Sequence, residues 1–401
     1  MLILHGILAA AAVAASALGR EGRHLPAAPG VSAASASLVI PLGAAAVDVA
    51  LGADPSPAIG TAVPLLVFLG SAMSLAALAE RSGLCDRAAA GLARAARGRC
   101  WAVHALVCAA SGGCTAVVSL DGAVVLMIPV VLALHRRYAA PFAPLFLGVV
   151  AVANPVSIAV PQGNPTNLVV MARLGLSPAA FIAHLALPGI AAAAVGAAGM
   201  ALGERGALAD RYRVPPAARS PWTAAERRAA AALAVAALVA CGCPLAGVAP
   251  WWPFAGVAAA ALAAERRLSG AVRIVLPWQV TVRVAALVVV IAALPLPPLA
   301  GGGLGAPALL AVAAGVGAVA AVVNNLPGSV WAASLLTAGP TAYAASIGLG
   351  VGAMATAHGS VATVVAADLA GGATDLVRAR RLAPLAAAGV VVACALLAVP
   401  L

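Results

Sequence analysis

Polar residues in a short stretch of an otherwise apolar sequence are the groups that can bind an ion or a solute. The stretch from Pro161 to Asn167 contains a glycine and two prolines within a long apolar segment. A helix interrupted inside a membrane leaves backbone groups that only protein or a water-filled cavity can satisfy. Freed carbonyls can hold a cation, and the amides of the next half-helix favour an anion. The candidate binding residues are Gln162, Gly163, Asn164, Thr166 and Asn167. The alternative is a proline kink sealed by its neighbours.

A single carboxylate, Asp121, lies near the middle of the apolar stretch 101–134. A carboxylate near the centre of a bilayer costs at least about 2.5 kcal/mol, so such a residue is by default functional. We expect Asp121 to exchange a proton or to bind a cation, and thereby to couple solute movement to an ion gradient. Ser119 and Gly122 are expected to belong to the same site. A purely structural role, with the carboxylate held by backbone amides, is the alternative.

The second half of the chain holds comparable polar groups. Asn324 and Asn325 lie in the middle of the uncharged stretch 301–340, where they can coordinate a solute or a cation, or cap helices. A second predicted helix break follows. Its candidate residues are His358, Gly359, Ser360 and Thr363. A lone histidine in a membrane helix more often packs than shuttles protons, so both roles of His358 stay open.

The composition excludes a soluble globular enzyme. Hydrophobic residues make up 64% of the 401 residues and charged residues 9%, with a mean hydropathy of +1.07, whereas a soluble domain carries about 25% charge. The basic residues are all arginine and lie in short runs between apolar stretches, which indicates one membrane face rather than a nucleic-acid surface. We expect a multi-pass protein of a bacterial plasma membrane. The cysteine and histidine spacings fit no metal site, and no cofactor is expected.

The apolar segments predict about eleven spanning helices and two helical hairpins. Simple spans are expected near 2–18, 31–52, 61–79, 179–202, 229–248, 249–264, 274–293 and 383–400. The stretch 101–134 would be about 51 Å long as one helix, against a hydrocarbon core of about 30 Å. Arginines flank both of its ends, so it should enter and leave the membrane on the cytoplasmic side. The uncharged stretch 301–340 lacks this marker and should enter from the other face.

A hairpin followed by a broken helix occurs twice, with opposite expected orientations. This order is the inverted-repeat plan of secondary transporters, which place their site at the membrane midplane. The predicted organisation is N-terminal helices 1–60, a first repeat 61–203 with hairpin 101–134 and broken helix 143–172, a cytoplasmic basic linker 204–228, a second repeat 229–383 with hairpin 303–340 and broken helix 341–369, and a C-terminal helix 384–401. The expected fold class is therefore an all-α polytopic membrane protein.

Several stretches resemble the arsenical pump membrane protein family, the arsenite/antimonite permeases, and its relatives in the ion transporter superfamily. Those relatives include divalent anion:sodium symporters and citrate carriers. The matching stretches are 77–84, 93–99, 120–123 leading into 128–134, 162–168, 324–327 and 359–363. The hairpin tip Leu120-Asp121-Gly122-Ala123 keeps the aspartate that is usual in the arsenical branch, with Leu120 where that branch usually has asparagine.

The resemblance implies a proton-coupled efflux permease for arsenite or antimonite, in which Asp121 carries the proton and the broken helices hold the solute. The alternative is a sodium- or proton-coupled transporter of di- or tricarboxylates such as citrate, or of another anion. The substrate is thus a small inorganic or organic anion or a neutral oxyacid. The family also implies a possible soluble ATPase partner, since the chain has no lysine to complete a phosphate loop of its own. A homodimer is possible.

An enzyme is the competing class. An intramembrane aspartyl protease needs a second buried aspartate in a characteristic glycine-rich setting, and the sequence has none. Ser360 and His358 are two residues apart, which is poor geometry for a nucleophile and its base. We therefore expect no catalytic residues.

Overall fold

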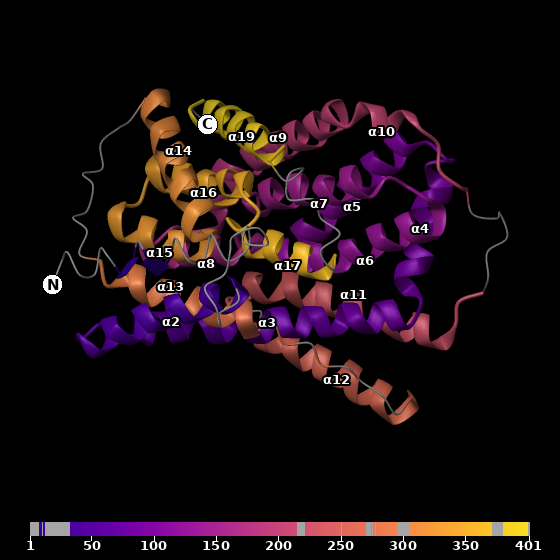
Figure 1. The fold of residues 1–401 in the computed structure, drawn as a ribbon, viewed down its shortest axis with the longest axis horizontal. Coiled ribbons are helices and arrows are strands. Elements are labelled where there is room, and N and C mark those ends of the chain that lie inside the picture. Colours follow the sequence, from indigo (N-terminus) through magenta and orange to yellow (C-terminus); the bar gives the residue numbers. More distant parts are fainter. Residues whose placement is uncertain are drawn as a thin grey trace.

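The computed structural model describes residues 8, 9, 11, 12, 33–214, 221–249, 251–269, 274, 276, 278–294, 305–370 and 380–399. Within these residues the regular structure is helical, and an isolated β-bridge joins Arg99 to Arg211. Most of the long helices run along the long axis of the molecule (Figure 1). The predicted span near 2–18 lies mostly outside the described residues.

The described residues of the first half of the chain form ten helical elements. They are α2 Ala33–Ala50, α3 Ser56–Arg81, α4 Leu84–Ala95, α5 Cys100–Val117, α6 Leu120–Tyr138, α7 Phe142–Ser157, the 3-10 helix η2 Pro161–Gly163, α8 Pro165–Leu174, α9 Pro178–Gly203 and α10 Arg205–Ala209. The second half continues the series. Its elements are α11 Ala224–Leu245, α12 Trp251–Ser269, α13 Trp278–Ala292, α14 Ala306–Val323, α15 Asn325–Leu335, α16 Pro340–Gly350, the 3-10 helix η3 Gly352–Ala355, α17 Val361–Leu369 and α19 Leu382–Leu397.

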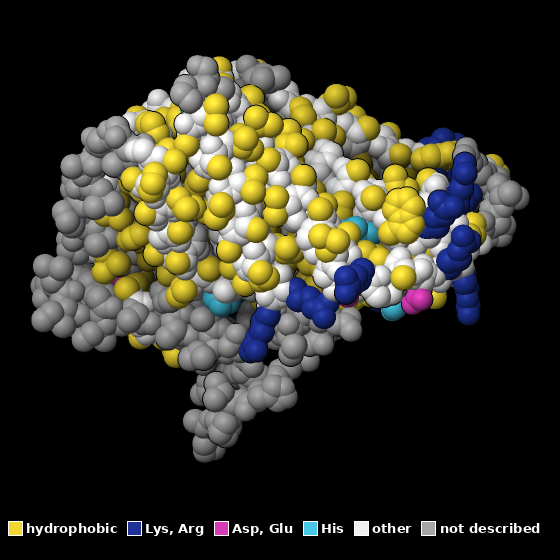
Figure 2. Space-filling model, turned by 90° about the horizontal axis from the view of Figure 1, so that it is seen from above, with side chains coloured by type: hydrophobic (Ala, Val, Ile, Leu, Met, Phe, Trp, Pro, Cys, Tyr) yellow, Lys and Arg dark blue, Asp and Glu magenta, His cyan; other side chains and the backbone are white. Residues whose placement is uncertain are grey.

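Four segments of the described chain are long and apolar enough to cross a membrane: Ala58–Arg81, Cys100–Val117, Pro178–Gly203 and Ala306–Val323. Other apolar helices are shorter. They are Leu38–Ala50, Phe142–Ser157, Thr281–Ala292 and Leu382–Leu397. Apolar side chains are spread over the described part of the face seen in Figure 2, and the basic side chains lie along its lower edge and at its right end. The fold is that expected of a polytopic membrane protein, while the count of eleven spans stays a prediction.

One order of elements occurs twice in the structure. A helix pair (α5 and α6, then α14 and α15) is followed by a broken helix (α7-η2-α8, then α16-η3-α17) and by an apolar helix (α9, then α19). The two sets interlock, because α8 packs against α15, and α17 packs against α6. The opposite membrane orientation of the two sets stays a prediction. Each half-helix after a break is 9 or 10 residues long, about half of what a full span needs.

The tips of both helix pairs form because a polar residue caps the second helix. Ser119 Oγ accepts a hydrogen bond from the Gly122 N–H at 3.1 Å. Asn324 Oδ1 accepts one from the Leu326 N–H at 3.3 Å. Asn324 has a φ of 86° and a ψ of 148°, a backbone conformation that residues with a side chain rarely adopt. These side chains satisfy amides that the start of a helix would otherwise leave unpaired inside the membrane.

At the basic end, Arg87 joins α4 to the start of α11. Its Nε and Nη2 donate to the two carboxylate oxygens of Glu226 at 2.9 and 2.8 Å, and its guanidinium lies 4.7 Å from the centre of the Trp222 ring. Glu226 also accepts from the Thr223 N–H, while Thr223 Oγ1 accepts from the Glu226 N–H. This reciprocal cap begins α11. Arg87 lowers the pKa of the Glu226 carboxyl to about 2.

Glu226→Gln is expected to lower the melting temperature of the purified protein at neutral pH, because it removes a bidentate charged contact between α4 and α11. A lowered pKa in the folded state means that ionised Glu226 stabilises the fold above its unfolded pKa of about 4.3. That contribution is lost as the pH falls toward about 2. Melting curves between pH 3 and pH 7 check this. Asp86→Asn, which removes the more exposed Arg137–Asp86 pair, is the control and should have the smaller effect.

Candidate functional site

The starts of four helices meet around one cavity. The helices are α6, α8, α15 and α17, and α3 adds one apolar side chain. The lining residues are Leu65, Leu120, Asp121, Asn164, Pro165, Asn325, Leu326 and Val361. Each of the four helices contributes residues from its N-terminal cap or first turn. The cavity has about 190 Å³ of empty space.

The electrostatics of this cavity favour an anion. A helix N-terminus carries the equivalent of roughly half a positive charge, because the peptide dipoles of the helix are aligned. Four such ends around one space therefore make a site for negative charge without any arginine or lysine in its lining. A proline kink with a purely structural role would need only one break in one helix, whereas here the starts of four helices meet.

Asp121 is the ionisable group in the cavity lining. Its side chain is 2% exposed and lies in the first turn of α6. Among the residues that the structure describes, no partner forms an ion pair or a hydrogen bond with its carboxylate. A buried carboxylate without a fixed partner is free to respond to what enters the cavity.

The first break is held open by its own asparagines and a glycine. Asn164 Oδ1 accepts from the Thr166 N–H at 3.1 Å and so caps α8, and its amide donates to Ser157 Oγ at 3.3 Å. Asn167 donates to the carbonyls of Ser157 and Val160 at 2.7 and 3.0 Å. A Cβ at Gly163 would overlap the carbonyl oxygen of Ser157. The two backbone segments can therefore approach this closely only with glycine at position 163.

The second break is tied directly to the tip of the second helix pair. The Asn325 N–H donates to the Gly359 carbonyl at 2.7 Å, and Asn324 Nδ2 donates to the His358 carbonyl at 2.7 Å. A Cβ at Gly359 would overlap the carbonyl oxygen of Ala353. Asn324 and Asn325 therefore position α17, and Asn325 also reaches the cavity.

Three buried hydroxyl groups near the cavity have no hydrogen-bond partner within the described part of the chain. They are Thr166 Oγ1 in the first turn of α8, and Ser360 Oγ and Thr363 Oγ1 at the start of α17. Their side chains are 1%, 0% and 4% exposed. Buried hydroxyls are nearly always paired, so each of these groups is available to a solute, an ion or water. Both breaks thus offer oxygen ligands.

Thr166→Val, Ser360→Ala and Thr363→Val are each expected to weaken substrate affinity without lowering the melting temperature of the unliganded protein. A hydrogen bond to a charged group contributes about 1.5–3 kcal/mol, which corresponds to roughly 10- to 100-fold in affinity. Concentration-dependent uptake and melting curves measure the two effects. Ser329→Ala is the matched control, because Ser329 Oγ already donates to the Leu326 carbonyl at 2.7 Å. A loss of stability equal to that of the control would contradict a ligand-binding role.

The structure distributes the predicted site residues over two roles. Asp121, Asn164 and Asn325 line the cavity, and the three unpaired hydroxyls lie at the helix starts beside it. The other predicted residues shape the backbone. Ser119, Asn167 and Asn324 do so through hydrogen bonds, Gly163 and Gly359 through their lack of a side chain, and His358 through its carbonyl. Gln162 donates to the Ala116 carbonyl at 3.3 Å, outside the cavity, and Gly122 borders a separate apolar crevice.

The sequence pattern did not single out three further polar residues. Asn154 in α7 is fully buried, and its Oδ1 has no partner among the described residues. Ser157 receives the amide of Asn164 and so stabilises the first break. Arg283 in α13 interacts electrostatically with Asp368 in α17. These two residues are the charged groups at the two ends of a long uncharged stretch of sequence. Asparagine or serine one or two turns before a proline-glycine break is the signal that could have found the first two.

The sequence model of the citrate transporter family matches residues 28–391, which is most of the chain. No curated protein matches the sequence. The family match agrees with the ion transporter superfamily resemblance and favours the predicted carboxylate alternative over arsenite or antimonite efflux, for which there is no further support.

Proposed function

The chain belongs to the citrate transporter family, and on that basis we propose that it is a secondary transporter that carries a citrate-like di- or tricarboxylate together with protons. The observation that carries this proposal is the meeting of four helix N-termini around one cavity that contains a single carboxyl group. The family identifies a membrane transporter of anions, and the finer choice of substrate and coupling ion is the proposal.

The charge of the cavity supports a carboxylate anion as the substrate. The dipoles of four helices that start at the cavity favour the negative charge of a carboxylate there. The unpaired hydroxyls of Thr166, Ser360 and Thr363 can donate to further carboxylate oxygens or to a citrate hydroxyl. Arsenite is a neutral oxyacid at neutral pH and would gain little from four positive helix ends.

The position of Asp121 supports coupling to protons. An anionic substrate and an ionised Asp121 would repel each other in the same low-dielectric cavity. Substrate binding therefore favours the protonated form of Asp121, and by linkage protonation favours substrate binding. A proton and an anion that bind together and leave together move in the same direction, which predicts symport driven by an inward proton gradient.

The size of the cavity supports transport by a change of shape. Small-molecule sites usually have volumes of about 300–1,000 Å³, whereas the enclosed space of this cavity is far too small for a tricarboxylate. A tricarboxylate would require the surrounding helices to move apart. The cavity is bordered by both helix pairs and both broken helices, so one rearrangement of these elements can open it to either side in turn.

Uptake by the purified protein in vesicles tests the proposal. An inward proton gradient is imposed, and the entry of radiolabelled citrate is followed once with sodium and once without sodium in the external buffer. We expect citrate uptake that collapses with a protonophore and does not require sodium. Uptake that requires sodium would mean that sodium, and not the proton, is the coupling ion. Absence of citrate uptake, with proton-dependent arsenite movement in the same vesicles, would overturn the choice of substrate.

A further inference from the structure

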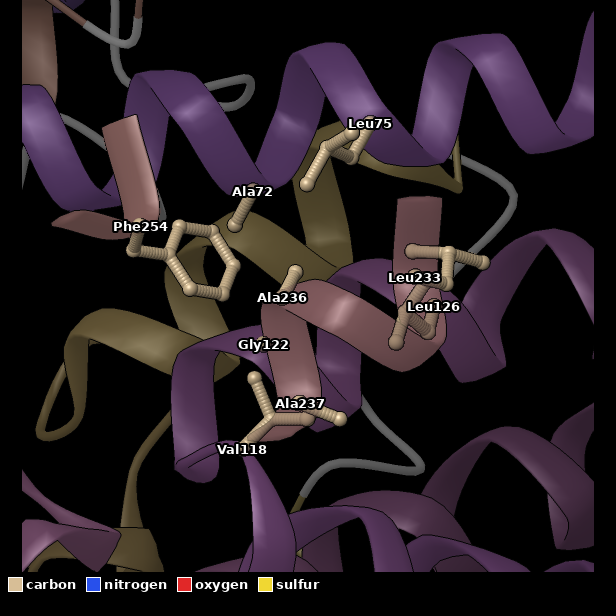
Figure 3. Close-up of a pocket in the computed structure, with 9 residues that line it drawn as sticks. All are labelled: Ala72, Leu75, Val118, Gly122, Leu126, Leu233, Ala236, Ala237 and Phe254. Carbon is tan, nitrogen blue, oxygen red and sulfur yellow. The ribbon is translucent and has the colours of Figure 1, made fainter. Parts of the chain in front are cut away.

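An apolar crevice lies behind the tip of the first helix pair, separate from the polar cavity. It is a narrow opening, with about 260 Å³ of space that includes the part open to the outside, and it is lined by apolar residues of α3, α6, α11 and α12 and of the turn between α5 and α6. The lining residues are Ala72, Leu75, Val118, Gly122, Leu126, Leu233, Ala236, Ala237 and Phe254. Figure 3 shows these side chains pointing toward a common space between the helices.

The crevice has one side at the surface of the molecule. Ala72, Leu75, Ala236 and Phe254 are buried, whereas Leu126, Leu233 and Ala237 are partly exposed. The neighbouring residues Val235 and Leu238 on α11 are 47% and 73% exposed. In a membrane transporter, apolar side chains exposed in this way face lipid. An opening in such a surface is surrounded by acyl chains rather than by water, and burying an acyl segment in it is favourable.

Arginines mark where a lipid headgroup would lie above this crevice. Arg227 and Arg228 lie at the start of α11, and Arg266 and Arg267 lie in the last turn of α12. Arg228 donates to Glu265 at 3.1 Å, so both pairs lie at the same end of the two helices. Counting these four arginines against Glu265 leaves an excess of three positive charges. Glu226, in the same turn, is paired with Arg87.

The position of the crevice along α11 matches an acyl chain whose headgroup lies at the arginines. Leu233 is five residues beyond Arg228 in α11, and Ala237 is nine residues beyond it, which corresponds to about 8 and 14 Å along the helix. One leaflet of the hydrocarbon core is about 15 Å thick. A phospholipid with its headgroup at the arginines would therefore place the upper part of one acyl chain beside the crevice.

We propose that this crevice binds one acyl chain of an anionic phospholipid whose phosphate lies at the arginines of α11 and α12. The proposal goes beyond the transported substrate, and its occupant touches the protein on the side of Gly122 that faces away from the polar cavity. A bound acyl chain would fill space behind the helix turn that carries Asp121.

Photo-crosslinking in lipid nanodiscs tests the site without any transport assay. The full chain is placed in phosphatidylcholine nanodiscs that contain small amounts of phosphatidylglycerol with a photoactivatable acyl chain, and the labelled peptides are mapped. We expect saturable labelling of α11 and α12 that excess unlabelled phosphatidylglycerol removes and excess phosphatidylcholine does not. Ala237→Leu and Ala236→Phe fill the crevice and should reduce this labelling about tenfold, as expected when two methylenes lose their burial.

Two further variants separate the site from general contact with lipid. Leu238→Phe changes a lipid-facing residue of the same helix outside the crevice and should leave the labelling unchanged. Arg227→Gln with Arg267→Gln should remove the preference for phosphatidylglycerol. Labelling that does not saturate, or that is equal in wild type and in an Ala237→Leu protein with an unchanged melting temperature, would overturn the proposal.

Discussion

Asp121→Asn is expected to abolish proton-driven accumulation of citrate while preserving exchange of citrate across the membrane. The asparagine resembles the protonated carboxyl, so the anion can still bind the cavity and cross with it. The variant cannot release a proton, so the gradient no longer drives net uptake. A gradient of one pH unit supplies about 1.4 kcal/mol per proton, or about tenfold accumulation. The wild type should approach this level, and the variant should show none.

Vesicles loaded with citrate measure both properties of Asp121→Asn. Exchange of internal for external labelled citrate reports binding and translocation, and net uptake under a pH gradient reports coupling. Asp210→Asn, at an exposed carboxylate on the basic end of the molecule, is the control and should behave as wild type. Loss of exchange together with accumulation, or unchanged accumulation, would contradict a coupling role for Asp121.

Gly163→Ala and Gly359→Ala are expected to eliminate transport and to lower the melting temperature. In each case the new Cβ would overlap a backbone carbonyl oxygen, that of Ser157 in the first break and that of Ala353 in the second. Backbone cannot rotate away as a side chain can, so the break itself must shift and move the start of α8 or α17. Overpacking of this kind costs about 1–3 kcal/mol or more.

Gly113→Ala is the control for both glycine variants. Gly113 lies in α5 with nothing near the position of an added Cβ, so alanine there should preserve both stability and transport. Uptake and melting curves of the three variants are compared side by side. Normal transport by Gly163→Ala or Gly359→Ala would mean that the helix break tolerates a side chain at that position. The close backbone approach at that break would then not be needed for the site.

The positions of the helix interruptions were predictable because their signals are local. Proline and glycine next to asparagine, serine or threonine mark helix starts, and Ser119, Asn164 and Asn324 each cap a helix through a side-chain oxygen. The apolar stretches likewise indicated helices, because a membrane demands that a segment satisfy its own backbone groups. These features depend on a few neighbouring residues and can be read from the sequence.

The contacts between distant segments were not predictable in the same way. Nothing in the spacing indicates that Asn325 bonds to Gly359, that α8 packs against α15, or that Arg283 lies near Asp368. Whether Asn167 faces a solute or its own backbone also depends on these packings. The substrate prediction leaned on the aspartate at one hairpin tip, whereas the charge of the site comes from four helix starts that only the folded chain brings together.

Hydrogen–deuterium exchange with and without citrate tests most directly whether the four helix starts form the binding site. Peptides covering 120–123, 165–168, 325–328 and 361–364 are followed by mass spectrometry in detergent, with the rest of the chain as the internal reference. We expect citrate to slow exchange at all four segments together, since one bound anion would stabilise the first turns of the four helices that border the cavity. Protection confined to the arginine-rich segments at the basic end, with none at the four helix starts, would contradict it.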